Sequence, residues 1–490
     1  MSLKDNRHIN DGIGSTRLQS CEVSQGGDML EKKQLEKYLK LCMASEADFA
    51  EIYEQKESSE LIRTLNGKLE EVNNTAINGV GIRLYKGTST VYAYSNENTE
   101  EALLPLISDL VDTIGRAEKD AEIELSEVKY ENNNPVKVDF ETVSLGEKAK
   151  LLLRATDAAK EADERIVKVQ ANLLNVKQQV QVSNSEGRLI GDTRVRTRIM
   201  VSAFALEGDN MQSGSDSPGA GKGLEFYDEI SPEDVGREAA REAIVNLSAK
   251  DCPSGKMPVI IDNGFGGVIF HEACGHALEA TGVAKDASVF AGKLGQRIAN
   301  ECVSAVDDGT IAGAWGSQNI DDEGNFQQRR ELIKDGILTT YMIDRLNGRR
   351  MGMESTGSGR RQSYQYEPTS RMSNTFILPG KDSFESLFEG IEKGLYAKKM
   401  GGGSVNPQTG EFNFAVSEGY MIIDGKIAYP VRGAALIGNG RDIRLNITKV
   451  SDNLSRGQGM CGSISGSIPT DVGQPAILVS SITVGGTANE

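Results

Sequence analysis

The stretch that decides how this 490-residue chain is organised is Val268-Ile269-Phe270-His271-Glu272-Ala273-Cys274-Gly275-His276-Ala277-Leu278-Glu279. It places two of the three histidines of the chain, His271 and His276, around Glu272. In the H-E-x-x-H zinc motif the histidines are four positions apart and share one helix face. Here they are five apart, which on an ideal α-helix turns the second imidazole about 140° from the first. We therefore predict a locally widened helix, such as a π-bulge, so that both rings can reach one metal ion.

The residues of this stretch point to hydrolysis by a metal-activated water. Zn²⁺ lowers the pKa of a bound water towards about 7 and polarises a carbonyl group, and the adjoining Glu272 is then suited to act as the general base. Gly275 lowers the steric barrier to a distorted helix before His276. The competing interpretation is a buried helix whose polar residues are satisfied locally.

A catalytic zinc site needs a third protein ligand. The sequence offers Glu279, Glu301, Cys302 and Cys461. Glu301 lies at a plausible distance on a following helix, and Cys461 lies in a glycine-flanked loop. Physical reasoning on the residues alone leaves this choice open.

Two other classes of function compete with a zinc enzyme. One is a thiol hydrolase, for which only Cys461 is credible, because Cys274 and His276 are two positions apart and point to different helix faces. The other is a non-enzymatic partner or regulatory protein with a structural metal closed by four protein ligands. The glycine clusters 264–267 and 401–403 lack the spacing and the lysine of nucleotide-binding loops, and they indicate turns or close backbone approach.

Composition excludes several classes of partner. The formal net charge is −17 and no basic stripe is present, which argues against nucleic-acid binding. The chain has no apolar run of about 18 residues, so no membrane span is expected. Its start lacks the apolar stretch of a secretory signal, which predicts a cytoplasmic location. The six cysteines include no CxxC pair and are expected to be reduced thiols.

The predicted fold class is α+β. Residues 1–30 are expected to be a disordered polar tail, and a natural start at Met29 is a hypothesis that N-terminal sequencing would test. Residues 31–130 are expected to form an N-terminal α/β domain with an antiparallel sheet, and residues 136–250 a central helix with antiparallel strands. Residues 251–490 are expected to form a β-rich, sandwich-like or barrel-like metallopeptidase domain that carries the motif helix. Within the central part, the Gly- and Ser-rich segment 208–223 is predicted to be a mobile loop.

Several blocks in order resemble the TldD group of the TldD/PmbA metallopeptidase family, from about residue 35 to the C-terminus. Besides the motif stretch, the matching blocks are Ser288-Val289-Phe290, Val306-Asp307-Asp308-Gly309-Thr310, Ile320-Asp321-Asp322-Glu323-Gly324, Gly359-Arg360-Arg361, Arg371-Met372-Ser373-Asn374-Thr375, Gly401-Gly402-Gly403, Gly433-Ala434-Ala435-Leu436-Ile437-Gly438, Met460-Cys461-Gly462 and Thr483-Val484-Gly485-Gly486-Thr487. The extra N-terminal tail departs from the family pattern.

The resemblance implies zinc ligation by His271, His276 and Cys461, with Glu272 catalytic. It also implies that unfolded peptides bind as an added strand within an enclosed chamber. Members of the family form homodimers, or heterodimers in which a metal-bearing subunit pairs with a PmbA-type subunit that lacks the histidine motif. This chain keeps the motif and so resembles the catalytic type. An older name of the family, modulator of DNA gyrase, finds no support in a nucleic-acid-binding signature here.

Overall fold

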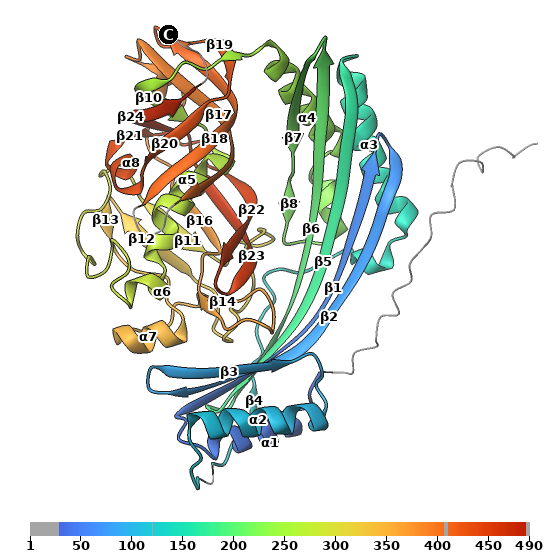
Figure 1. Ribbon diagram of the computed structural model, residues 1–490, viewed down its shortest axis with the longest axis vertical. Coiled ribbons are helices and arrows are strands. Elements are labelled where there is room, and N and C mark those ends of the chain that lie inside the picture. Colours follow the sequence, from blue (N-terminus) through green and yellow to red (C-terminus); the bar gives the residue numbers. More distant parts are fainter. Residues whose placement is uncertain (1–28, 120, 406–409, 487–490) are drawn as a thin grey trace, which may run out of the picture.

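The computed structural model describes residues 29–119, 121–405 and 410–486, and its architecture is α+β, as predicted (Figure 1). The first 28 residues of the predicted polar tail lie outside the described residues. Leu30, at the end of that segment, is buried, and its amide donates to the Glu54 carboxylate at 2.9 Å. Among the described residues, no helix combines the length and the apolar character needed to cross a membrane.

A long, strongly curved and mainly antiparallel sheet runs through the N-terminal half of the molecule, with the short strand β4 paired in parallel to β6 (Figure 1). Its strands follow the order β3-β2-β1-β5-β6-β4, with β7 and β8 also pairing with β6. The first hairpin turns at Asn66 and Gly67, which both have positive φ, as the favoured two-residue hairpin turn requires. The strands are β1 (Phe49–Leu65), β2 (Lys68–Lys86), β3 (Ser89–Ser95), β4 (Ser126–Glu127), β5 (Ile166–Asn184), β6 (Arg188–Glu207), β7 (Asn210–Asp216) and β8 (Gly219–Ala220).

Four capped helices cover parts of this sheet. They are α1 (Lys32–Met43), α2 (Glu100–Ile114), α3 (Leu145–Ala162) and α4 (Pro232–Ser248). The capping box predicted at Ser144 and Glu147 is present, and Ser231 caps α4 ahead of Pro232. Figure 1 shows α3 and α4 against the long strands, and α1 with α2 at the far end beside β3.

The prediction of a mobile loop over 208–223 is wrong. Asn210–Asp216 is strand β7, which pairs with β6 from Glu207↔Asn210 to Val201↔Asp216. Gly214 in this strand lets α4 approach closely, because a Cβ on Gly214 would lie 2.3 Å from the Ala239 carbonyl oxygen. Small residues that allow close approach of a helix therefore resembled loop composition.

The C-terminal half contains a barrel and a second sheet that share one core. Strands β17, β10, β24, β20 and β18 pair in a closed ring, which resolves the predicted sandwich-or-barrel alternative as a barrel. The second sheet follows the order β13-β12-β11-β16-β23-β22. The strands are β9 (Lys250–Asp251), β10 (Gly255–Ile261), β11 (Ala305–Asp308), β12 (Arg329–Lys334), β13 (Ile337–Leu338), β14 (Gly359–Arg360), β15 (Thr369–Ser370), β16 (Asn374–Ile377), β17 (Lys393–Val405), β18 (Glu411–Ile423), β19 (Lys426–Arg432), β20 (Ala435–Asn439), β21 (Ile447–Val450), β22 (Ser455–Ser463), β23 (Gly466–Gln474) and β24 (Ile477–Gly485).

Short helices lie between these strands. They are α5 (Val268–Phe270), α6 (Ala280–Val283), α7 (Arg345–Met351) and α8 (Gly440–Asn446). The apolar side chains of α5 belong to the same buried cluster as Val259 of the barrel and Val472 of the second sheet. The helix that begins the motif is thus fixed between the two β units.

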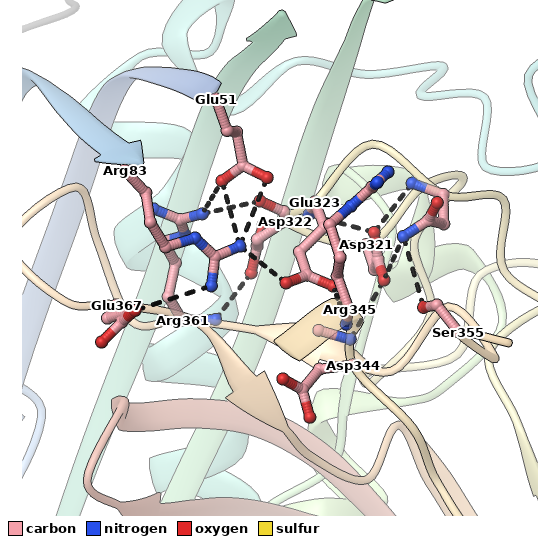
Figure 2. Close-up of polar contacts among 12 residues, drawn as sticks. Glu51, Arg83, Asp321, Asp322, Glu323, Asp344, Arg345, Ser355, Arg361 and Glu367 are labelled. Atoms are coloured by element: carbon pink, nitrogen blue, oxygen red, sulfur yellow. Dashed lines mark hydrogen bonds and ion pairs between the residues drawn. The ribbon is translucent and has the colours of Figure 1, made fainter. Parts of the chain in front are cut away.

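A buried network of ion pairs joins the first strands to the C-terminal half (Figure 2). Arg83 of β2 contacts Glu323 at 2.6 Å, and Arg361 contacts Glu51 of β1 at 2.8 Å. All four side chains are buried. Because unpaired buried charges are costly, this network ties the two halves together in one arrangement.

Candidate metal centre

The motif helix is widened as the histidine spacing predicts. His271–Gly275 forms a π-helical turn, η4, in which the backbone N–H of His276 donates to the carbonyl of His271, five residues earlier. The extra residue in the turn brings both rings to one side, with their centroids 5.0 Å apart. The rings therefore converge rather than diverge.

Gly275 serves this turn by its size rather than by its backbone freedom. Its φ of −54° and ψ of −55° are ordinary helical values, open to any residue. A Cβ at this position would, however, lie 2.3 Å from the sulfur of Met372. The glycine lets the turn pack closely against the segment that contains Met372.

Cys461, on strand β22, reaches the two histidines from far along the chain. Its Sγ lies 3.2 Å from Nε2 of His271 and 3.3 Å from Nε2 of His276. Among the described residues, these three form the one group of His, Cys, Asp or Glu side chains with ligand atoms all within 4.8 Å of one another. Two ligands that bind one zinc tetrahedrally stand about 3.5 Å apart, given bonds of about 2.3 Å to sulfur and 2.0–2.1 Å to nitrogen. The donor set and its spacing fit a zinc ion.

Two carboxylates flank His276 on opposite sides of its ring. Glu279 lies behind the ring, with Oε1 3.2 Å from Nδ1, while Glu272 lies on the Nε2 side at 3.7 Å. Glu279 is buried, whereas the Glu272 side chain is 27% exposed. A carboxylate on the second ring nitrogen is the usual partner of a metal-ligating histidine. Glu279 therefore suits orientation of the ring, and Glu272 is open to a reacting molecule.

The charges of the site favour a thiolate. Burial alone would raise the pKa of Cys461, but the adjacent His271 and His276 lower that pKa to about 3. Burial lowers the pKa of His276, and the Glu279 carboxylate and the Cys461 sulfur outweigh it, so that this pKa lies well above its ordinary value. An ionised sulfur is the form that binds a metal.

The other candidates for a third ligand lie outside this cluster. Glu279 faces Nδ1 of His276, and the Cys302 thiol donates to the carbonyl of Ile447 at 3.5 Å. Glu301 lies in an exposed turn rather than on the expected helix. Of the residues that the sequence offered, the structure brings Cys461 to the two histidines.

Sequence models of three PmbA/TldA metallopeptidase domains match the chain, domain 1 over residues 50–121, the central domain over 138–247 and the C-terminal domain over 254–486. The chain belongs to the PmbA/TldD metallopeptidase family. Its resemblance to that family and its assignment as a metallopeptidase are thereby confirmed.

Individual relatives agree with the family assignment. A metalloprotease TldD homologue of Haemophilus influenzae is 38% identical over 454 residues, covering 90% of this chain and 93% of the relative. A metalloprotease of Methanocaldococcus jannaschii is 34% identical, covering 91% and 98%. Because PmbA/TldD relatives of this similarity are named metalloproteases, a metal cofactor is implied.

Solved structures show the same fold. A Thermotoga maritima protein named as a modulator of a DNA gyrase superposes with a TM-score of 0.73 at 23% identity, covering 89% of this chain and 96% of that one. TldE from Thermococcus kodakarensis gives a TM-score of 0.71 at 17% identity, covering 93% and 99%. At these identities the likeness concerns the fold alone.

The sequence does not predict the positions of Glu279 and Arg371 at the site. It offers Glu279 as a ligand, whereas the structure puts this side chain behind His276. It indicates Arg371 only as part of a block that resembles the family, yet the Arg371 guanidinium donates to the carbonyl of Cys461. The spacing of Glu279, three residues after His276 within the motif stretch, was a usable signal, whereas nothing near Arg371 in sequence indicates its contact.

Proposed function

We propose that this member of the PmbA/TldD family is a zinc-dependent peptidase that hydrolyses unfolded peptides. His271, His276 and Cys461 would hold the zinc, and Glu272 would be the general base. The observation that carries the proposal is the convergence of one sulfur and two imidazole nitrogens within 3.2 and 3.3 Å, beside an accessible carboxylate.

The protein residues have separate tasks in this mechanism. When bound, zinc would supply a Lewis acid that acidifies a water molecule and polarises the scissile carbonyl. Glu272 accepts the proton of the attacking water and delivers it to the leaving amine. The Glu279 carboxylate, with Oε1 3.2 Å from Nδ1 of His276, would orient that ring through its charge.

The position of β22 supports an extended peptide as the substrate. This strand carries Cys461 and is the last strand of its sheet, so that it pairs with β23 alone among the described strands. Figure 1 shows it facing the long sheet, where Arg198 donates to the carbonyl of Gln458 at 3.0 Å. A peptide that adds to an edge strand is bound through its main chain, which gives affinity with little sequence preference.

A thiol hydrolase is the second candidate, because Cys461 lies between two imidazoles and has a pKa lowered to about 3. Activity on unstructured peptides, measured with and without a strong zinc chelator, separates the two candidates. We expect the chelator to abolish cleavage and added Zn²⁺ to restore it. Full activity after complete removal of metal would overturn the zinc proposal and favour the thiol enzyme.

We also propose that the active form is a dimer, with a second copy or with a TldE-type subunit. The support is the family assignment and the fold shared with TldE. Light scattering of the chain alone and mixed with such a subunit, combined with activity, tests this directly. The cytoplasmic location expected from the sequence stays a prediction.

A further inference from the structure

The hairpin that carries Cys461 needs an anchor. Cys461 lies 185 residues after His276, near the end of the outermost strand of its sheet. Strand β22 contains glycines at 457, 459 and 462, and the tip is exposed, with Met460 and Ile464 55% and 73% accessible. An edge hairpin rich in glycine does not by itself hold a sulfur to within a few tenths of an ångström.

Arg371 donates three hydrogen bonds to the end of this hairpin. One guanidinium nitrogen, Nη1, donates to Ser465 Oγ and to the carbonyl of Gly466, each at 2.9 Å. The other, Nη2, donates to the carbonyl of Cys461. The side chain is fully buried, and it follows β15 directly in the chain. The planar fork of an arginine matches such a set of acceptors, and a lysine cannot reproduce it.

The same side chain reaches the other half of the site. Nε of Arg371 lies 3.9 Å from Oε1 of Glu279, the oxygen that faces Nδ1 of His276 at 3.2 Å. Neither Arg371 Nε nor Glu279 Oε1 has a hydrogen-bond partner in the described part of the chain. Arg371, Cys461, His276 and Glu279 thus form a closed circuit of neighbours around the two ligands.

A second arginine supports the opposite strand of the hairpin. Arg360 donates from Nη2 to the carbonyl of Pro469 at 3.0 Å and from Nη1 to that of Met372. Pro469 is paired across the hairpin with Met460. Arg360 holds β23, whereas Arg371 alone of the two contacts the residue that bears the sulfur.

From these contacts we infer that Arg371 is a positioning residue for the metal centre, which sets the place of the Cys461 sulfur relative to the two imidazoles. The inference rests on the proposed function, because it takes Cys461 as a ligand. Its consequence is that zinc affinity depends on a side chain that touches neither the metal nor the substrate. Loss of such an outer partner typically lowers metal affinity by about 10- to 100-fold.

Zinc affinity, measured by competition with a chromophoric chelator, tests the inference with a matched control. Arg371→Lys should weaken zinc binding by about 10-fold or more. Arg330→Lys is the control, since Arg330 is also a buried arginine that donates to two carbonyls, those of Thr356 and Gly357, but does not contact the hairpin. Its zinc affinity should match that of the unaltered chain. Equal affinities for both variants would overturn the inference.

A double-mutant cycle with Cys461→Ala shows whether Arg371 acts through the sulfur. Without the sulfur, Arg371→Lys should change zinc affinity by less than about threefold, because there is no ligand left to position. An undiminished effect in that background would refute the inference in favour of general destabilisation. With Co²⁺ as the probe, Arg371→Lys should also weaken the thiolate-to-cobalt charge-transfer band, which Arg330→Lys leaves intact.

Two further measurements distinguish failure of this inference from misfolding of the variant and from failure of the proposed function. If Arg371→Lys does not fold, Ser465→Ala removes one acceptor of the same guanidinium and should weaken zinc binding by a smaller factor in the same direction; no change would count against the inference. If the unaltered chain itself binds no zinc, the proposed function fails, whatever Arg371 does.

Discussion

At the scale of single residues, the proposed metal centre consists of buried groups and one accessible carboxylate, the proposed general base. His271, Cys461 and Glu279 are buried, whereas Glu272 is open on the side of His276 that faces the sulfur. General acid–base catalysis contributes about 10²- to 10⁴-fold to a rate. Exchange of Glu272 for Gln is therefore expected to lower kcat on an unstructured peptide by about 10²-fold or more. The zinc content should stay near one ion per chain. A variant that retains full activity would remove Glu272 from its role.

The third ligand can be tested by metal content alone. Cys461→Ala should lose zinc during dialysis, because two imidazoles remain where a catalytic site needs three protein ligands. Cys302→Ala is the matched control, since this thiol contacts a backbone carbonyl away from the cluster. Glu301→Gln controls for the carboxylate that the sequence left open. Zinc loss in either control, with retention in Cys461→Ala, would contradict the assignment.

The charge state of the sulfur gives a pH prediction for the metal-free chain. The pKa of Cys461 is lowered to about 3, so the thiolate should persist as pH falls, whereas an ordinary thiol is protonated below about 8.5. The ultraviolet thiolate absorbance, taken as the difference from Cys461→Ala, should therefore stay constant between pH 8 and about 4.5. A midpoint near pH 8 in that difference would show that the imidazoles do not stabilise the thiolate.

At the scale of elements, the π-helical turn depends on close packing of Gly275 against Met372, a contact that the local sequence does not predict. A side chain on Gly275 would overlap the sulfur of Met372, and overpacking of this kind costs about 1–3 kcal/mol. Gly275→Ala should lower the free energy of unfolding by that amount and weaken zinc binding. The combination with Met372→Ala, which empties the space, should recover part of the zinc affinity.

A glycine in an open place provides the comparison for that change. Gly146 lies in helix α3 with nothing near its missing Cβ. Gly146→Ala should be neutral or raise the free energy of unfolding by up to about 1 kcal/mol, because alanine favours helix. Denaturant unfolding of both variants measures the contrast. If Gly275→Ala destabilises the chain no more than Gly146→Ala does, the π-helical turn can accommodate a Cβ at position 275 and the predicted overlap with Met372 is wrong.

Elements with a local signal were predictable from the sequence, and elements defined by distant contacts were not. The capping box at Ser144 and the five-residue histidine spacing both act within a few positions, and each predicted what is observed. The composition of Asn210–Asp216 predicts a loop, whereas the segment is a strand whose one glycine, Gly214, packs against a helix that follows it in the chain. The choice of Cys461 over the other candidate ligands rests on the family resemblance. Cys461 is 190 residues from His271, and a local sequence pattern cannot predict a contact between residues so far apart in the chain.

At the scale of the whole molecule, the arrangement of the two halves depends on buried charge. Sequence patterns predicted a β-rich C-terminal unit, but not that Arg83 of β2, which pairs with Glu51 of β1, would reach Glu323, 240 residues later in the chain. Arg83, Glu51 and Glu323 are all buried. Hydrophobic periodicity carries no information on such a pairing, because it concerns which charges meet in three dimensions.

Removal of Arg83 is therefore expected to destabilise the interface between the two halves rather than a single strand. Arg83→Met keeps much of the volume but removes the guanidinium that contacts Glu323 at 2.6 Å and Glu51 at 3.3 Å, and the loss of one partner from a buried ion pair costs about 3–5 kcal/mol. Arg63→Met is the control on the same sheet, since Arg63 pairs with Glu71 at 2.8 Å with both side chains about half exposed, where such pairs contribute about 1 kcal/mol or less. Thermal unfolding followed together with limited proteolysis should show Arg83→Met melting earlier, with cleavage first in the segments that join the two halves. If both variants lose the same small amount of stability, the network in Figure 2 does not hold the halves together, and the hydrophobic contacts between them do.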